Sequence, residues 1–285
     1  MITSVHGARL KALRVQIDEA LANLAPPQDT NDRVAAAMRY ALISPGKRIR
    51  PLLTLITAAQ LGRSTAEAMP AACALELVHA ASLVLDDLPC MDDADERRGR
   101  PTTHRRFGED VAVLAGVGLL NEAYALIGGA HHVPADARCE MVSLLSRTVG
   151  PGGLIGGQDR DLMGCEAGSL DDLRDMHQAK TGVLFVAAVE MGALVAGAGA
   201  DAREALRQCA CELGLAFQAL DDLQDEAELE GPRPGSNLLS MLSKQGARDE
   251  AANRMERARQ ALMSGPPQLA AMGGYLDLLV SPLAA

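Results

Sequence analysis

Two dense clusters of aspartates are the residues in this sequence whose types and spacing best suit chemistry. The first follows an apolar, alanine-rich stretch and places four carboxylates within eight positions, at Asp86, Asp87, Asp92 and Asp93. Carboxylates this dense repel one another unless cations neutralise them, and hard divalent cations with oxygen ligands are the usual partners. Three arginines follow directly, at Arg97, Arg98 and Arg100. Because a guanidinium binds a phosphate through paired hydrogen bonds, this segment predicts a site for metal and phosphate.

The spacing of the first cluster requires a break in the helix. Asp86 and Asp92 are six residues apart and would point in different directions on a regular helix. Pro89 lacks a backbone N–H and would clash with the carbonyl of Leu85, so we expect the helix to loosen or end there. The later carboxylates would then fold back towards the earlier ones. The alternative is an acidic helix end followed by a basic loop that binds nothing.

The second cluster lies in the segment AFQALDDLQDE, residues 216–226. Its polar residues fall at i, i+3, i+4 and i+7, which is one face of an uninterrupted helix, and they are Gln218, Asp221, Asp222 and Asp225. Apolar residues surround them, so an ordinary solvated face does not explain the pattern. The two clusters together predict two walls of one cavity that binds several Mg²⁺ ions and a diphosphate.

A third group of charges follows the turn at residues 44–46 and consists of Lys47, Arg48 and Arg50. Three cations beside a glycine predict a second diphosphate site, although a solvated helix start would have the same composition. His79 lies seven residues before Asp86 and shares its helix face. A lone histidine on an apolar helix is usually a core residue, but this register with Asp86 favours a ligand role.

The elements that must position these groups are almost all helical, and no convincing alternating strand is present. Predicted helices span 5–24, Asn31 or Asp32 to about Leu42, 52–61, Thr65 or Glu67 to Leu88, 108–130 and 135–149, and a further one begins at Ser169 in a capping-box pattern with Asp172. The chain is 48% hydrophobic and contains no Trp, three Phe and three Tyr, so its core must be mainly aliphatic. We expect one all-α domain that spans residues 1–285.

Charge and composition exclude several classes of protein. The formal net charge of −10 argues against nucleic acid as a partner. The N-terminal segment has no apolar signal core, and we expect no apolar run long enough to span a bilayer, hence a cytoplasmic protein without a transmembrane segment. The six cysteines are scattered through helical stretches without zinc-type spacing, which predicts reduced thiols. The glycine-rich stretch 150–161 lacks the GK[ST] of a phosphate loop and is expected to allow close helix packing.

Five segments in this chain resemble the motifs of the trans-polyprenyl diphosphate synthases, and most closely those of bacterial geranylgeranyl diphosphate synthases from carotenoid pathways. They occur in the family's order and are PGKRIRP (45–51), ELVHAASLVLDDLPCMDDADERRGRPTTH (76–104), GGLIGGQDRDL (152–162), AKTGVLF (179–185) and AFQALDDLQD (216–225). Paired aspartate motifs at this distance are a highly specific signal. The resemblance implies the isoprenoid-synthase fold, a helical bundle around a central cavity, and a homodimer.

The resemblance also implies a reaction, head-to-tail condensation of isopentenyl diphosphate with dimethylallyl, geranyl or farnesyl diphosphate. It assigns Mg²⁺ binding to Asp86, Asp92, Asp221 and Asp225, which are catalytic together with Lys180. It assigns isopentenyl diphosphate to Gly46, Lys47, Arg50, His79 and Arg98. It assigns binding of the allylic diphosphate to Arg97, Lys180 and Thr181. Gln218 and Asp222 are further substrate-binding residues by the same resemblance. Gln158 and Asp161 are expected to face the cavity. No side-chain nucleophile is needed.

Product length in this family depends on what closes the pocket for the hydrocarbon tail. Ala81 and Ser82 stand five and four residues before Asp86, where farnesyl synthases often place an aromatic floor. Both side chains are small and leave room for another five-carbon unit. The sequence therefore predicts a C20 product, geranylgeranyl diphosphate.

One segment departs from the family's pattern. After the second aspartate cluster the family usually has loop lysines, whereas this chain has Pro232 and then Gly235–Ser236, with Arg233 nearby and Lys244 beyond. A missing cation at a desolvated diphosphate would weaken catalysis. A farnesyl diphosphate synthase and a weakly active or non-catalytic regulatory subunit therefore stay open as alternatives. A terpene cyclase is disfavoured, because cyclase cavities use aromatic faces and this chain has six aromatic residues in total.

Overall fold

The computed structural model describes the backbone of residues 2–163, 169–228 and 237–284, and the side chains of residues 5–163, 169–224 and 237–281. Its elements are α1 (Ile2–Leu24), α2 (Arg33–Leu42), α3 (Ile49–Gln60), α4 (Thr65–Asp86), β1 (Glu96–Arg97), β2 (Arg100–Pro101), α5 (Thr103–Phe107), α6 (Glu109–Gly129), α7 (Ala135–Val149), α8 (Leu154–Leu162), α9 (Leu170–His177), η1 (Gln178–Gly182), α10 (Val183–Ala196), α11 (Ala200–Glu228), η2 (Leu238–Ser240), α12 (Lys244–Ser264), η3 (Pro267–Met272) and α13 (Gly273–Ala284). The predicted all-α class is confirmed.

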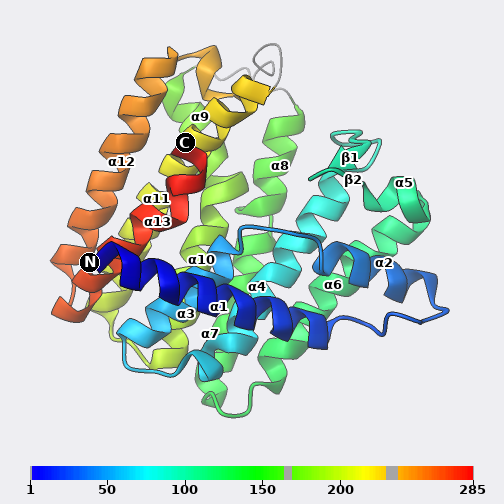
Figure 1. Cartoon of the computed structure of the whole chain (residues 1–285), viewed down its shortest axis with the longest axis horizontal. Helices are drawn as coiled ribbons and strands as arrows, with labels where there is room; N and C mark the ends of the chain where they lie inside the picture. The colour runs from blue at the N-terminus through cyan, green and yellow to red at the C-terminus, as the bar shows by residue number, and fades with distance from the viewer. Residues whose placement is uncertain (1, 164–168, 229–236, 285) are drawn as a thin grey trace.

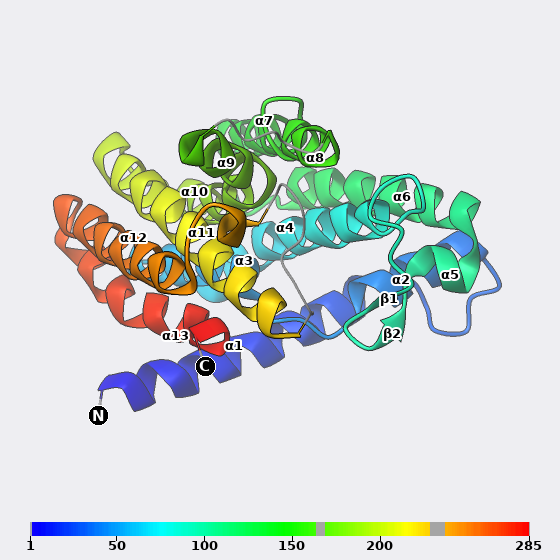
Figure 2. The ribbon, with the colours of Figure 1, turned by 90° about the horizontal axis from the view of Figure 1, so that it is seen from above.

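The long helices pack as a bundle, seen from two directions in Figures 1 and 2. α4 contacts α3, α6 and α10, and α11 packs along α10 and α12. Figure 2 shows α1 and α13 on one side of the bundle and α7, α8 and α9 on the opposite side. One continuous apolar cluster draws buried residues from α1 through α13, including Ile17, Leu75, Leu213 and Leu276. This aliphatic core agrees with the composition and holds the polar site residues on rigid helices.

Local sequence signals explain where several helices begin. The Asp32 carboxylate accepts the backbone N–H groups of Val34 and Ala35 at the start of α2. Ser64 and Glu67 form a complete capping box at the start of α4. The Ser169 hydroxyl accepts the N–H of Asp172 and begins α9, as the sequence pattern predicts.

Several details differ from the predicted elements. α3 begins at Ile49 rather than residue 52, because Pro51 is tolerated in a first helical turn. α4 ends at Asp86 rather than Leu88, since the chain already turns back at this point. The helix that begins after Ser169 is interrupted by η1, a single turn of π-helix. An antiparallel pair of two-residue strands, β1 and β2, was not predicted.

Three helical stretches are long and apolar enough to cross a membrane by length and composition, so the expectation of no such run is wrong. They are Thr65–Asp86, Glu109–Gly129 and Leu170–Ala196, and the buried share of the most apolar window is 61%, 39% and 67%. The first and third are apolar because they pack inside the bundle, where α4 and α10 contact each other as well as α3. The stretch in α6 is the least covered of the three. The five cysteines in the described part of the chain are unpaired, as predicted.

Close packing between α10 and α3 depends on a glycine. A Cβ atom added at Gly192 would lie 2.5 Å from the carbonyl oxygen of Thr54 and 2.8 Å from the Cβ of Thr57. Both neighbours belong to α3, and a helix backbone cannot move away as a flexible side chain can. The approach of these two helices therefore requires a residue without a side chain.

Replacing this glycine should separate the helices. We expect Gly192→Ala to lower the free energy of unfolding by about 1–3 kcal/mol, because the added methyl group overpacks the contact. Gly128→Ala in α6 is the matched control, since nothing lies within 4 Å of its added Cβ, and it should raise stability by up to about 1 kcal/mol. Chemical denaturation of both variants gives the measurement, and equal effects would contradict this account.

Candidate active site

The first aspartate cluster folds back on itself after α4, as the spacing predicts. The backbone N–H of Asp92 donates to the carbonyl of Asp86 at 2.9 Å, and that of Ala94 donates to the carbonyl of Asp87 at 3.2 Å. Asp93 adopts a left-handed backbone conformation with φ of 47°. The turn therefore brings the Asp92 residue beside Asp86, which an unbroken helix would not do.

Asp86 lies in an environment of mixed charge. Burial raises the pKa of its carboxyl to about 6; the positive charge of Lys180 lowers that pKa, and the negative charge of Asp92 raises it. Lys180 itself forms an ion pair with Asp161 from α8. It stands in η1, the π-helical turn, rather than in a regular helix. This turn places an ammonium group between the first aspartate cluster and α8.

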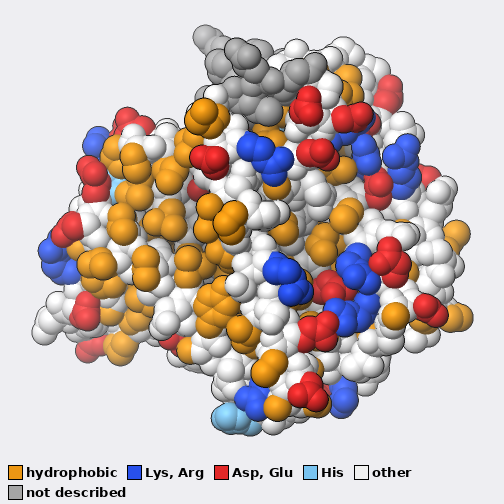
Figure 3. All heavy atoms as spheres, turned by 180° about the vertical axis from the view of Figure 1, so that it is seen from behind, with side chains coloured by type: hydrophobic (Ala, Val, Ile, Leu, Met, Phe, Trp, Pro, Cys, Tyr) orange, Lys and Arg blue, Asp and Glu red, His pale blue; other side chains and the backbone are white. Residues whose placement is uncertain are grey.

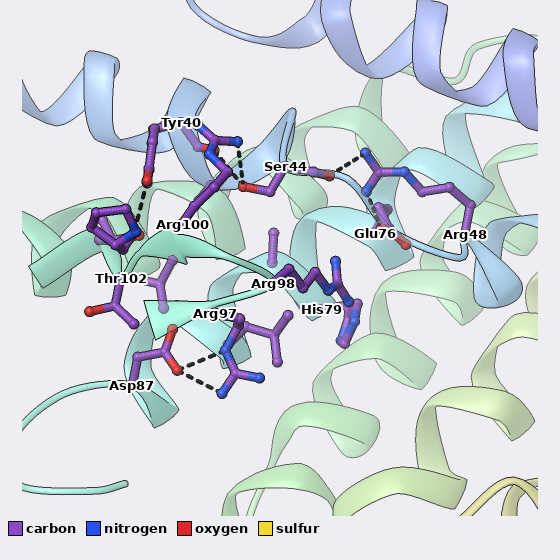
Figure 4. Close-up of a pocket in the computed structure, with 16 residues that line it drawn as sticks. Tyr40, Ser44, Arg48, Glu76, His79, Asp87, Arg97, Arg98, Arg100 and Thr102 are labelled. Carbon is purple, nitrogen blue, oxygen red and sulfur yellow. Dashed lines mark hydrogen bonds and ion pairs between the residues drawn. The ribbon is translucent and has the colours of Figure 1, made fainter. Parts of the chain in front are cut away.

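Asp87 is buried and binds Arg97, a contact that the sequence analysis missed. Its Oδ1 accepts a hydrogen bond from Arg97 Nε at 2.7 Å and lies 2.6 Å from Arg97 Nη2. This two-point contact fixes the guanidinium plane (Figure 4). The doubled aspartate at 86–87 was the available signal, because two neighbours on a helix point to different sides.

The second aspartate cluster lies on α11, which is uninterrupted from Ala200 to Glu228 as predicted. The Thr181 hydroxyl donates to Gln218 Oε1 at 2.8 Å, and Gln218 Nε2 donates to Asp222 Oδ1 at 2.8 Å. The other oxygen of Asp222 accepts the backbone N–H of Leu238 at 2.7 Å. This chain of bonds ties η1 to α11 and to the segment that follows the second cluster.

Of the two remaining aspartates in the second cluster, the structure describes the side chain of Asp221 but not that of Asp225. The negative charge of Asp221 acts on the guanidinium groups of Arg50 and Arg98, so this carboxylate faces the basic residues of α3 and the hairpin. The side chain of Asp225 lies outside the described residues, and so do Pro232, Arg233 and Gly235–Ser236. Lys244 begins α12.

Two cations of the predicted basic site lie near aromatic rings. The Lys47 ammonium lies 6.0 Å from the ring centre of Phe217, and the Arg50 guanidinium lies 5.1 Å from that of Phe185. These two rings are themselves 5.2 Å apart. Burial lowers the pKa of Arg50 to about 10, while the charges of Glu76 and Asp221 act in the opposite direction. The aromatic face of Phe185 and the two carboxylates thus stabilise the buried Arg50 guanidinium, whereas Lys47 is exposed.

His79 on α4 lies beside Arg50. Its Nε2 is 3.4 Å from Arg50 Nη1. Burial and then the charge of Arg50 lower the pKa of His79 well below its usual range, so the imidazole is neutral. His79 Nδ1 and Arg50 Nε are buried and have no hydrogen-bond partner among the described residues. An unpaired buried donor is costly, so Arg50 Nε marks a place where an anion would be stabilised.

A pocket of about 50 Å³ lies between α2, α4 and the β1–β2 hairpin. Its lining includes His79, Arg97 and Arg98, but not Asp86, Asp92 or Asp221, so it differs from the cavity expected between the aspartate clusters. Arg98 Nη1 donates to the carbonyl of Pro45 at 2.6 Å, and a Cβ on Gly46 would lie 2.8 Å from the same Nη1. The absence of a side chain at Gly46 therefore lets Arg98 approach the loop.

The two residues predicted to control product length both lie on α4. Ala81 is fully buried in the apolar core, and Ser82 is half-buried with its hydroxyl donating to the carbonyl of His79. Gln158 on α8 is buried, and its amide atoms have no partner among the described residues. The polar amide in this position is compatible with the cavity-facing role that the sequence implies.

The carboxylates suit Mg²⁺ in kind. Oxygen atoms are the ligands that Mg²⁺ prefers, and the ion commonly uses one or two carboxylates together with phosphate oxygens of a substrate. Among the described side chains, no three from His, Cys, Asp and Glu are grouped closely enough to hold a metal by themselves. The influence of Asp92 on the pKa of Asp86 shows that these two carboxylates are near each other. The donor set fits Mg²⁺ if a diphosphate supplies further oxygens.

Comparison with known proteins identifies the family. A family model described as polyprenyl synthetase matches residues 31–230, which include both aspartate clusters and the Lys47 loop. The chain belongs to the polyprenyl synthetase family. The sequence-based prediction of a prenyltransferase that acts by head-to-tail transfer is thereby confirmed.

Other members of the polyprenyl synthetase family match this chain over most of its length. The geranylgeranyl diphosphate synthase of Pseudescherichia vulneris is 40% identical over 277 residues, covering 94% of this chain and 90% of the relative. The geranylgeranyl diphosphate synthase of Pantoea ananas is 46% identical over 216 residues, covering 75% and 72%. The farnesyl diphosphate synthase of Geobacillus stearothermophilus is 38% identical over 262 residues, covering 87% and 88%.

A solved structure supports the same grouping. The FPP/GFPP synthase of Zymomonas mobilis superposes with a TM-score of 0.87 at 32% identity, covering 98% of this chain and 99% of that chain. The fold of this protein is thus that of a prenyl synthase from nearly end to end.

Proposed function

We propose that the protein is a geranylgeranyl diphosphate synthase that condenses isopentenyl diphosphate with an allylic diphosphate. The observation that carries the proposal is the contrast between two neighbouring sites. The Asp86 carboxylate is influenced by the charges of Asp92 and Lys180. Lys47 and Arg50 instead lie over the Phe217 and Phe185 rings, with neutral His79 beside Arg50. One site suits a metal-bound diphosphate and the other suits a second diphosphate bound by cations, as a two-substrate condensation requires.

In this proposal, the basic site holds isopentenyl diphosphate through Gly46, Lys47, Arg50, His79 and Arg98. The unpaired Arg50 Nε would donate to a diphosphate oxygen. The adjacent site holds the allylic diphosphate through Arg97, Lys180 and Thr181, with Gln218 and Asp222 orienting them. Thr181 bonded to Gln218, and Gln218 bonded to Asp222, support that orienting role.

Asp86, Asp92, Asp221 and Asp225 would hold Mg²⁺ opposite the allylic diphosphate. When bound, Mg²⁺ neutralises that diphosphate so that it can leave as pyrophosphate. Lys180 and Arg97 add positive charge where the leaving group becomes more negative. The carbon–oxygen bond of the allylic substrate breaks, and the double bond of isopentenyl diphosphate supplies the electrons for the new carbon–carbon bond. The proton lost in the last step goes to the departing pyrophosphate.

We also propose that residues 1–285 act as one domain of a cytoplasmic, carotenoid-pathway enzyme that forms a homodimer. α6 has no charged residue from Val111 to Asn121, and Val113, Leu114 and Val117 are exposed on it. Figure 3 shows hydrophobic side chains gathered on this face of the molecule, over α6 and towards α8. A second copy covering that face would remove this apolar surface from water.

Light scattering should accordingly give twice the chain mass of 29.9 kDa, and the mass of a single chain would exclude the dimer.

Product analysis tests the proposed reaction directly. Purified protein is incubated with isopentenyl diphosphate, Mg²⁺ and each allylic primer in turn, and a C20 product is expected. Chelation of the metal should abolish turnover, because the aspartate clusters then repel the allylic diphosphate. A clean C15 product would favour a farnesyl diphosphate synthase, as in the Geobacillus stearothermophilus relative. Folded protein that binds diphosphate without elongation would favour a regulatory subunit.

Product length should respond to the residues on α4 before Asp86. We expect Ala81→Phe or Ala81→Tyr to shift the product from C20 towards C15, because an aromatic ring would shorten the space for the tail. Ala81 is fully buried, so a loss of stability of about 1–3 kcal/mol is expected as well. Ser82→Phe, at a half-buried position, is the companion variant if Ala81→Phe does not fold. An unchanged product distribution in folded variants would remove both residues as the floor.

A further inference from the structure

Arg48 is buried in the middle of the Lys47–Arg50 segment, which is called the basic loop below. Its neighbours Lys47 and Arg50 lie near the aromatic rings of Phe217 and Phe185. Its exposed fraction is 7%. Its backbone adopts a left-handed conformation, with φ of 53° and ψ of 32°, at the residue before α3. Residues other than glycine rarely adopt this conformation unless surrounding contacts impose it. The side-chain contacts of Arg48 identify what imposes it.

The Arg48 guanidinium uses all three of its nitrogens. Nη1 donates to Glu76 Oε1 at 2.5 Å, and Nε donates to Asp18 Oδ1 at 2.8 Å. Nη2 donates to the backbone carbonyl of Ser44 at 2.9 Å. One side chain therefore joins α1, α4 and the turn before the basic loop, and Figure 4 shows it directed towards Glu76. A planar guanidinium can satisfy these separate directions at once, whereas an ammonium group cannot.

Glu76 is the buried counter-charge of the basic site. Its exposed fraction is 4%. Besides its ion pair with Arg48, its negative charge acts on Arg50 and Arg98, where it raises the pKa against the effect of burial. One carboxylate thus contacts the Arg48 guanidinium directly and acts on two further guanidinium groups through its charge. Without it, the mutual repulsion of Arg50 and Arg98 would lose the negative charge that offsets it.

The geometry of the loop follows from this anchor. The Arg48 side chain points inwards to Glu76, and this contact fixes the course of the backbone through the loop. The side chains of Lys47 and Arg50 then reach Phe217 and Phe185. Arg98 binds the same loop from the hairpin through the carbonyl of Pro45. The loop is therefore arranged by contacts within the protein, with no ligand required.

We propose that Arg48 and Glu76 are positioning residues, which arrange the Lys47–Arg50 loop to receive the diphosphate of the non-allylic substrate. The inference rests on the proposed function, because that function makes this loop the isopentenyl diphosphate site. Arg48 and Glu76 act through Lys47, Arg50 and Arg98, and neither needs to touch the substrate. Losing the pair should weaken the binding of isopentenyl diphosphate and leave the binding of the allylic diphosphate unchanged.

Glu76→Gln separates positioning from simple electrostatics. If charge alone mattered, removing a carboxylate beside a diphosphate site would tighten binding of the polyanionic substrate. If the carboxylate positions the loop, its removal should weaken that binding. The two explanations therefore predict opposite signs for one substitution.

The chain offers a control in a second ion pair with a buried carboxylate, between half-buried Arg203 and buried Glu190. Arg203 Nη2 lies 2.7 Å from Glu190 Oε2, and Glu190 is as buried as Glu76. This pair joins α10 to α11, and neither residue lines the pocket beside the basic loop. Glu190 also lies 3.7 Å from Arg207 Nε, and Arg203 Nη2 lies 2.7 Å from Glu140 Oε1. Each control variant therefore disturbs a network of ion pairs around a buried carboxylate without touching Lys47 or Arg50.

The experiment compares Arg48→Gln and Glu76→Gln with Arg203→Gln and Glu190→Gln. For the first two variants we expect the KM for isopentenyl diphosphate to rise about tenfold or more, with less than about a threefold change in kcat or in the KM for the allylic primer. The control variants should lower the melting temperature but leave both KM values unchanged. Asp18→Asn, which removes the half-exposed negative charge beside Arg48 Nε, should give a smaller rise in the same KM.

Three results would overturn the inference. They are a lower KM for isopentenyl diphosphate in Glu76→Gln, equal rises in both KM values, and a rise that the control pair reproduces. If Arg48→Gln does not fold, the same KM values are measured in Arg48→Lys and Asp18→Asn. Each of these variants keeps some of the contacts that hold the loop. Elongation by the unaltered protein tests the proposed function separately. If it fails, calorimetric titration of isopentenyl diphosphate into metal-free protein still measures whether Glu76→Gln weakens binding, and unweakened binding rejects the inference.

Discussion

Groups of like charge held together inside an apolar helical bundle are the constraint on which the rest of this structure depends. Each group is stabilised by an opposite charge from another element. Asp87 binds Arg97, Lys180 binds Asp161, and Glu76 binds Arg48. A buried charge without a partner is strongly destabilising, so these pairs let the site exist in the absence of substrate. They also leave other groups, such as Arg50 Nε, available for a ligand.

α4 is the element that relates the two charged regions to each other. Glu76, His79 and Asp86 fall at i, i+3 and i+10, so they share one face of the helix. A rigid helix fixes the spacing between the Lys47–Arg50 loop, whose Arg48 binds Glu76, and the aspartate-rich turn, which begins at Asp86. The apolar face of α4 packs against α3, α6 and α10, and this packing keeps the helix in place. In the function proposed above, that fixed spacing would set how far the two substrates are held from each other.

Much of the fold and part of the candidate site could be predicted from local patterns. Asp32, Ser64 with Glu67, and Ser169 begin helices where the capping signals place them, because a cap depends on neighbouring residues alone. The reversal at Pro89 was predictable for the same reason. The burial of Arg48 and the pairing of Asp87 with Arg97 were not, because a row of charged residues does not reveal which of them points inwards. That choice depends on contacts with α1, α4 and the hairpin.

The sequence by itself determined the all-α class and the family, and it singled out the aspartate and basic residues proposed for diphosphate chemistry. Their types and spacing follow from helical periodicity and from the charge of the substrates, which are local and chemical constraints. The tertiary structure decided what holds those residues in place. It put Lys180 and Thr181 on a π-helical turn, paired buried Glu76 with Arg48, and let the same carboxylate act on Arg50 and Arg98. These arrangements bring together residues far apart in the chain, and burial away from water makes their pairing compulsory.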